Sequence, residues 1–197
     1  MRYRPGQKQI TRERVLKAAA GAIRSEGADR VSVVGIMSEV GLTHGGFYSH
    51  FASREDLITA AIGQMFRECQ ERLRRETLAR PPEEGLAAYI DFYLSPAHRD
   101  MVVIGCPLPF LSSEASHLAA GPRQRFASGV AGMLDVLTDL FRRLGRAEPE
   151  AEALSLLSEL SGATALARAE PDPAVSAAIL AQTKIMLRRR IGLATPH

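Results

Sequence analysis

The residue types best suited to chemistry gather in residues 43–50, which read THGGFYSH. Thr43, His44, Tyr48 and His50 carry hydroxyl and imidazole groups on short or rigid side chains, and such groups suit hydrogen bonds to phosphate oxygens. The two histidines are six residues apart and have no Cys, Asp or Glu partner at metal-ligand spacing. We therefore expect no metal at this stretch and interpret it as a binding surface.

Other side chains that could support catalysis lack the context that catalysis needs. Ser49 precedes His50, and Ser112 and Ser113 precede Glu114, but neither group sits in a nucleophile-elbow sequence. The sequence therefore predicts no catalytic residue, no cofactor and no enzymatic activity.

The elements that must position residues 43–50 show themselves by their helix starts. Ser32 can cap a short helix, and Gly41 can end it, because glycine tolerates the left-handed conformation of helix ends. Thr43 then caps a second short helix that runs to about His50. Ser53 caps a third helix, with Asp56 three residues on. Two short helices joined by a tight glycine turn describe a helix-turn-helix, whose second helix enters the major groove of DNA.

Within this unit, several residues are candidates for DNA contact. Gly45 is a poor helix former, and bare backbone there would allow close approach to the groove. Thr43 and His44 lie where base-edge or phosphate contacts are made, whereas Tyr48 and His50 suit phosphates. Ser32 and Arg54 stand at helix starts that would flank the DNA backbone. Phe47 and Phe51 are expected in the core instead.

The rest of the chain predicts an all-α protein of about nine helices in 197 residues. A three-helix head, residues 1–57, would be followed by a helical bundle, residues 58–197, that binds ligand and dimerises. The helix from about Arg54 to Leu78 would bridge both parts. The other expected helices cover approximately residues 11–27, 83–94, 122–144, 149–168 and 173–190, with short helices and turns between 98 and 116.

Charge and composition narrow the function class. Hydrophobic residues make up 46% and charged residues 24%, as in ordinary globular proteins, and no apolar run suggests a membrane span. Residues 1–60 hold nine Lys/Arg against six Asp/Glu, which accounts for the formal charge of +3 of the whole chain. Arg2, Arg4 and Lys8 form a basic arm that could face phosphates or simply be solvated. Two cysteines suit a reducing cytoplasm, where we expect the protein.

The block around the helix-turn-helix resembles the DNA-binding signature of the tetracycline-repressor (TetR) family. The matching residues are Gly41-Leu42-Thr43, Gly45, Phe47-Tyr48-Ser49-His50-Phe51 and Ser53-Arg54-Glu55-Asp56-Leu57. Gly35, Met37 and Arg54 depart from the commoner residues at their positions. The resemblance is strong over about a quarter of the chain, and it implies a regulator that binds a double-stranded DNA operator.

In repressors of this family, the segments that follow the head surround an effector cavity. The resemblance therefore implies a small-molecule effector, and ten aromatic or sulfur-containing side chains are candidates to line its pocket, although ordinary core is the alternative for each. They are Met65, Phe66, Tyr89, Phe92, Tyr93, Met101, Cys106, Phe110, Phe126 and Met133. Cys106 stands in GCPLPFLSSEA, which resembles a stretch in a family branch that includes an electrophile-sensing repressor; an inert buried thiol is the alternative.

The family also implies a homodimer joined through its last two helices. Small residues beside leucines there would allow close packing against a partner helix. The candidate interface residues are Leu154, Leu157, Ser158, Ser161, Gly162, Val175, Ile179 and Met186.

The favoured hypothesis is a homodimeric repressor that a small apolar or electrophilic effector releases from a palindromic operator. There are two alternatives. The first is an effector-independent DNA-binding activator or architectural protein, and the second is a small helical enzyme. A fully filled C-terminal part would favour the first alternative, and a polar pocket with converging acid and base groups would favour the second.

Overall fold

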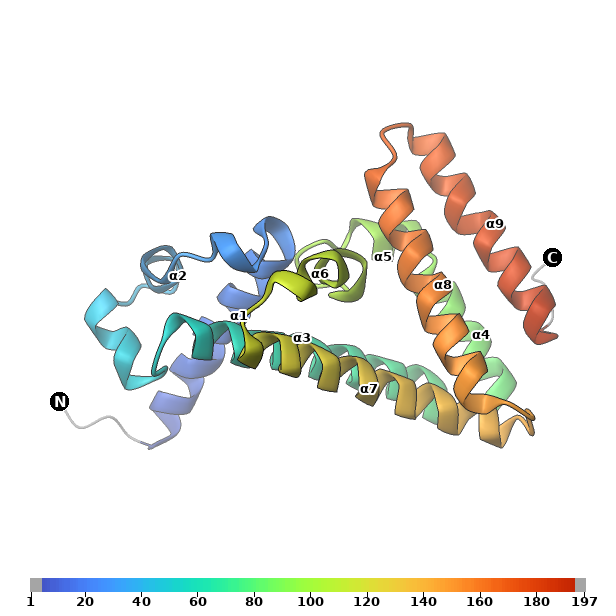
Figure 1. The fold of residues 1–197 in the computed structure, drawn as a ribbon, viewed down its shortest axis with the longest axis horizontal. Coiled ribbons are helices and arrows are strands. Elements are labelled where there is room, and N and C mark those ends of the chain that lie inside the picture. The colour runs from blue at the N-terminus through green and yellow to red at the C-terminus, as the bar shows by residue number, and fades with distance from the viewer. Residues whose placement is uncertain (1–4, 194–197) are drawn as a thin grey trace.

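A computed structural model describes residues 5–193 of the chain, and Arg2 and Arg4 of the basic arm lie outside them. Within these residues the protein is helical and has no strand. Figure 1 shows a head at one end, two long helices side by side, and a helical pair at the far end. The α-helices are α1 (Pro5–Glu26), α2 (Val33–Glu39), α3 (Arg54–Leu78), α4 (Pro82–Tyr93), α5 (Pro96–Asp100), α6 (Leu108–Glu114), α7 (Ala120–Arg143), α8 (Pro149–Ala169) and α9 (Pro173–Ile191). Three short 3₁₀ helices are η1 (Ala28–Arg30), η2 (His44–Ser49) and η3 (Ala115–His117).

Three helix boundaries in the head are set as predicted, at Ser32, Gly41 and Ser53. The Ser32 hydroxyl accepts from the Gly35 N–H at 3.2 Å, and the Ser53 hydroxyl accepts from the Asp56 N–H at 3.0 Å. The Asp56 carboxylate in turn accepts from the Ala52 N–H, so the start of α3 is held from both sides. Gly41 adopts a φ of 71°, in the left-handed region that ends α2.

Two predicted elements are corrected. Helix α1 begins at Pro5 rather than Thr11, because proline is tolerated at the first turn of a helix and fixes a helical φ. The segment after Thr43 is a 3₁₀ helix rather than an α-helix, and the Thr43 side chain makes no capping hydrogen bond. Two consecutive glycines weaken an α-helix there, which leaves the tighter 3₁₀ turn.

The head and the body share α3. Its residues Leu57 and Ile58 are buried at the head end, and Met65, Phe66 and Leu73 are buried further along. Helix α7 lies alongside α3 (Figure 1) and approaches it closely at Gly129, where an added Cβ would collide with the Phe66 ring. The Phe66 and Phe126 rings meet edge to face, with 5.4 Å between their centroids. The α3–α7 pair therefore forms the long, closely packed frame of the body.

Aromatic packing fixes the second half of the helix-turn-helix. Phe47 and Phe51 are buried and stack with 5.6 Å between centroids, which confirms their expected place in the core. The Arg12 guanidinium of α1 lies over the Phe51 ring at 4.5 Å.

No helix in the described part of the chain is long and apolar enough to span a bilayer.

Candidate nucleic-acid interface and ligand cavity

The exposed face of the head carries the side chains that the sequence singled out. Thr43, His44 and Gly45 are exposed, and Tyr48 is 66% exposed although it belongs to a packed aromatic cluster. The His44 and Tyr48 rings meet edge to face at 5.9 Å, so each helps to orient the other. The exposed donors therefore stand on a short helix whose inner side is held by the packed Phe47 and Phe51 rings.

Gly45 has open space where a side chain would stand. A Cβ added there would meet nothing within 4 Å, and its φ lies outside the positive range. Neither packing nor backbone conformation inside the protein therefore requires glycine at this position. Glycine at this position leaves that part of the η2 surface without a side chain.

Helix α1 adds positive charge beside His50. Burial is the main cause that lowers the pKa of His50, and the nearby cations Lys8 and Arg12 lower it further. Lys8 and Arg12 are four residues apart and share one face of α1, a spacing that could have indicated a basic stripe from the sequence. These charges place a positive field next to the 3₁₀ helix η2.

Arg54, which the sequence offered as a DNA-backbone contact, is exposed but makes hydrogen bonds within the head. Its guanidinium donates to the carbonyls of Val31 at 2.9 Å, Ala28 at 2.7 Å and Asp29 at 2.8 Å. These bonds occupy its planar donor face, so Arg54 ties η1 to the first turn of α3. Ser32 is exposed beside this junction, and its hydroxyl is used as a helix cap.

A cavity of about 710 Å³ lies where the head meets the body. From the predicted pocket set it brings together Tyr89, Phe92, Tyr93, Met101 and Cys106. The other five predicted residues do not line it: they are Met65, Phe66, Phe110, Phe126 and Met133. Met65 and Met133 are fully buried, and Phe66 and Phe126 pack against each other, so these side chains form the α3–α7 frame.

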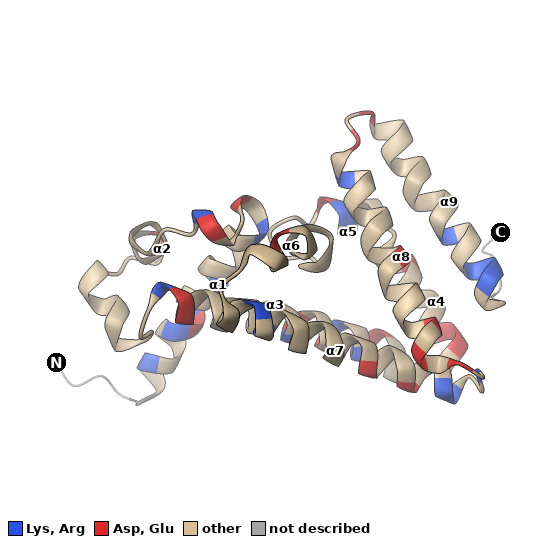
Figure 2. Ribbon diagram, in the orientation of Figure 1, with Lys and Arg blue, Asp and Glu red and all other residues tan. Residues whose placement is uncertain are grey.

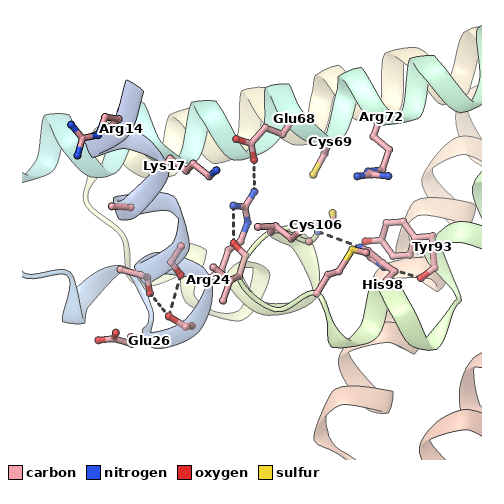
Figure 3. Close-up of a pocket in the computed structure, with 18 of the residues that line it drawn as sticks. Arg14, Lys17, Arg24, Glu26, Glu68, Cys69, Arg72, Tyr93, His98 and Cys106 are labelled. Atoms are coloured by element: carbon pink, nitrogen blue, oxygen red, sulfur yellow. Dashed lines mark hydrogen bonds and ion pairs between the residues drawn. The ribbon is translucent and has the colours of Figure 1, made fainter. Parts of the chain in front are cut away.

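Sequence reasoning missed the contribution of the head to this cavity. Arg14, Lys17 and Arg24 of α1 reach it, as Figure 3 shows. Arg24 is only 4% exposed; it donates to the Val103 carbonyl at 3.1 Å and to the Glu68 carboxylate at 2.9 Å. One buried cation thus joins α1, α3 and the turn before α6. The signal that the sequence offered is the run of small residues 18–22, which leaves room on α1 just before Arg24.

His98 holds the inner end of the cavity. It is 2% exposed, its Nδ1 bonds the Tyr93 carbonyl at 2.8 Å, and its Nε2 accepts from the Cys106 N–H at 3.3 Å. Because Nε2 accepts, Nδ1 must carry the proton and donate. Burial lowers the pKa of His98 to about 4. A neutral imidazole with both nitrogens engaged positions Cys106 and is not free to act as a base.

The Cys69 and Cys106 side chains both line the cavity, and their thiols interact with each other (Figure 3). Burial alone would raise the pKa of Cys106, but interactions with the Cys69 thiol, the Tyr93 hydroxyl and the Leu108 backbone lower it overall. The hydrogen bond to Cys106 is the main cause that raises the pKa of Cys69, together with burial. The described residues contain no group of three His, Cys, Asp or Glu side chains placed to hold a metal.

Helices α8 and α9 expose apolar side chains on one side. Leu154 is 55% exposed, Val175 45% and Met186 57%, and Ser158 and Gly162 are also exposed. Ser161 and Ile179 are half-buried. Figure 2 shows few charges along the middle of α8 and the first half of α9. Leu157 is different, because it is 4% exposed and faces the interior of this chain.

The comparisons with known proteins agree with this geometry. Residues 15–61 match the family model described as "Bacterial regulatory proteins, tetR family". A TetR-family transcriptional regulator from Chloroflexus aurantiacus is 26% identical with a TM-score of 0.81, over 95% of this chain and 96% of that one. A TetR-family regulator from Agrobacterium tumefaciens is 25% identical with a TM-score of 0.79, over 92% and 98%. The reduced form of NemR from E. coli is 21% identical with a TM-score of 0.81, over 95% and 100%.

No match was found among curated protein sequences. The helix-turn-helix head, its exposed donors and the attached helical body define a DNA-binding transcriptional regulator. Residues 15–61 match the TetR-family model, and the two TetR-family regulators from Chloroflexus aurantiacus and Agrobacterium tumefaciens share the fold over more than nine-tenths of this chain, so the chain has a TetR-type head on a TetR-type helical body.

The state of His98 predicts how stability depends on pH. Its folded pKa of about 4 lies below the ordinary value of 6.5, so the unfolded chain binds a proton that the folded chain refuses. Stability should therefore fall as the pH drops from 6.5 toward 4, by up to about 3 kcal/mol. Urea unfolding at a series of pH values measures this loss, and His98→Gln should flatten it. The exposed His117→Gln serves as control; equal slopes for wild type and His98→Gln would contradict the assignment.

Proposed function

We propose that the protein is a homodimeric repressor that leaves a palindromic operator when a small, largely apolar effector enters the cavity between head and body. The single observation that carries this proposal is the position of the cavity, whose wall includes α1 of the head. A ligand there touches the DNA-binding unit directly. Residues 1–57 serve as the DNA-binding part and residues 58–197 as the dimerising part, with the cavity spanning that boundary.

The docking of the head follows from its exposed donors. Tyr48 and His50 contact phosphates, whereas Thr43 and His44 reach base edges at the start of η2. Lys8 and Arg12 extend the contact along α1. In a dimer, two such heads about 34–36 Å apart would read two half-sites on one face of the DNA.

Induction follows from the way Arg24 joins three segments. A ligand wedged beside α1 and α3 disturbs the bonds from Arg24 to Val103 and Glu68, so the head shifts on the body. The ligand must bind the DNA-incompetent arrangement better, and a coupling of about 1–3 kcal/mol changes operator affinity roughly 5–150-fold. The large cavity argues against the effector-independent alternative, and the engaged nitrogens of His98 argue against an enzyme.

A thiol-reactive electrophile is a second candidate effector. The lowered pKa of Cys106, in the wall of the cavity, favours it. The thiolate would add to the β-carbon of an activated double bond, forming one C–S bond, and the α-carbon would take up a proton, with no leaving group. The adduct would then occupy the cavity as a tethered ligand.

The DNA contact is tested with operator DNA selected from a random pool. Tyr48→Phe removes one hydrogen bond to a charged phosphate and should weaken binding about 10-fold, equally for all sequences. His44→Ala should weaken binding and also change base preference. Fluorescence anisotropy with selected and scrambled DNA measures both effects, and His117→Ala, an exposed histidine outside the head, is the control. Unchanged binding by Tyr48→Phe would show that η2 does not dock as assigned.

The dimer is tested on the exposed side of α8 and α9. Met186→Glu places a charge in the apolar interface and should shift sedimentation from dimer to monomer. The control is Leu78→Glu, because Leu78 is equally exposed at the end of α3. Leu157→Arg is unsuitable as a probe, since a buried charge there would unfold the monomer. If Met186→Glu forms a dimer with unchanged affinity, the dimer interface does not lie on this side of α8 and α9.

The electrophile is tested on preformed protein–DNA complexes treated with N-ethylmaleimide. Wild type and Cys69→Ser should be released, whereas Cys106→Ser should stay bound. If Cys106→Ser is released as readily as wild type, Cys106 is not the reacting thiol and the non-covalent effector stands.

A further inference from the structure

The polar groups at the inner end of the cavity are mostly hydrogen-bond donors. Arg24 and Arg72 offer guanidinium N–H groups, and Tyr89 and Tyr93 offer hydroxyls. Burial raises the pKa of both tyrosines, so both remain protonated donors. The acceptors nearby are already used: Glu68 accepts from Arg24 at 2.9 Å and from Gln64 at 3.0 Å.

Two of these donors are buried without a good partner. The Tyr93 hydroxyl has no oxygen or nitrogen partner within residues 5–193, and the group beside it is the weakly accepting sulfur of Cys106. The Nε of Arg24 is also buried without a hydrogen-bond partner in the described chain. Unpaired buried donors cost stability in the empty protein, and a ligand that brings acceptor oxygens would remove that cost.

The charge of the inner end is positive. Glu68 is neutralised by Arg24, which leaves Arg72 facing the cavity. The Arg72 guanidinium lies over the Phe92 ring at 4.5 Å, and no carboxylate in the described part of the chain forms an ion pair with it. In Figure 3, Arg72 and Tyr93 lie at the same end of the cavity, whereas Glu26 lies at the opposite end. A negative ligand group is therefore favoured at the Arg72 end.

The remaining walls are apolar. Phe92 and Met101 lie next to the donors, and Ala18 and Ala22 line the side formed by α1. Val103 and Ile104 are 52% and 61% exposed on the turn that borders the cavity, so an apolar body can make contact as it enters. The volume of about 710 Å³ accommodates a medium-length chain or two rings.

We propose that the cavity binds an organic monocarboxylate with an apolar body, whose carboxylate accepts from Arg72 and from the Tyr93 hydroxyl. This inference rests on the proposed function for its regulatory meaning, but binding itself requires only the protein. It narrows the effector from any apolar compound to an amphipathic anion. Neutral and cationic analogues of the same body lack the group that the donors select.

The experiment compares three ten-carbon probes, decanoate, decan-1-ol and decyltrimethylammonium, by isothermal titration calorimetry on the full chain without DNA. Decanoate should bind at least about 10-fold more tightly than the alcohol, because only the anion pairs with a guanidinium. The cation should bind most weakly. Equal affinities for decanoate and decan-1-ol would overturn the proposal.

Two variants locate the carboxylate. Arg72→Met keeps most of the stem and should reduce decanoate affinity about 10-fold while leaving decan-1-ol unchanged. Tyr93→Phe removes only the hydroxyl and should reduce decanoate affinity several-fold. Arg67→Met, on the exposed side of the same helix, is the matched control and should bind like wild type. A decanoate affinity unchanged in both Arg72→Met and Tyr93→Phe would also overturn the proposal.

Release of operator DNA by the same probes distinguishes a failure of this ligand class from a failure of the proposed induction mechanism. If decanoate binds through Arg72 but does not release operator DNA, the ligand class stands and the induction mechanism fails. If decan-1-ol releases operator DNA and decanoate does not, induction stands and the ligand class fails.

Discussion

Helix α3 is the constraint on which the rest of the structure depends, because two hydrophobic interfaces share its single continuous backbone. Leu57 and Ile58 bury its first turns against the head, and Phe66 packs against α7 where Gly129 leaves room. Its start is fixed by the Ser53 and Asp56 caps and by the three carbonyl bonds of Arg54. The body therefore cannot rearrange around α3 without moving the head.

The cavity exists because this frame is not closed on the side of α1. Small residues such as Ala18, Gly21 and Ala22 on α1 face the segment that contains Cys106, and they leave space that larger side chains would fill. Arg24 crosses that space and meets Glu68 and Val103. In this ion pair the Arg24 side chain is 5% exposed and the Glu68 side chain 39% exposed. Such a pair gives little net stability, but with the bond to Val103 it sets one geometry for the groups that it joins. That property suits a joint between the cavity and the head.

Local rules in the sequence predicted most of the fold. The serines at 32 and 53 and the glycine at 41 placed helix ends in the head, because such signals act over three or four residues. The 3₁₀ form of η2 was missed, since glycine propensity weakens an α-helix without specifying what replaces it. The exposure of the donors on η2 follows from equally local features of the sequence. The hydrogen bonds of Arg54 within the head were missed because its partners lie more than twenty residues earlier, at Ala28 and Val31.

The cavity was predicted only in part because it depends on packing between distant segments. Aromatic and sulfur residues were reasonable candidates, but periodicity does not distinguish Phe126, which fills the α3–α7 frame, from Phe92, which borders open space. Leu157 was likewise assigned to an interface because both faces of α8 carry leucines. Which leucine is inward depends on how α8 rotates against α7 and α9, and a single helix does not encode that rotation.

The length of α3 has a mechanical consequence. With 25 residues and a rise of about 1.5 Å per residue, it is a rod of roughly 37 Å that is stiffened along one side by α7. A tilt of about 5° at the body end would carry the head end by about 3 Å, close to the rise of one base pair in B-DNA. A displacement smaller than a methyl group beside the cavity would thus be amplified into a register error at the groove, and in a two-fold assembly the two errors would add.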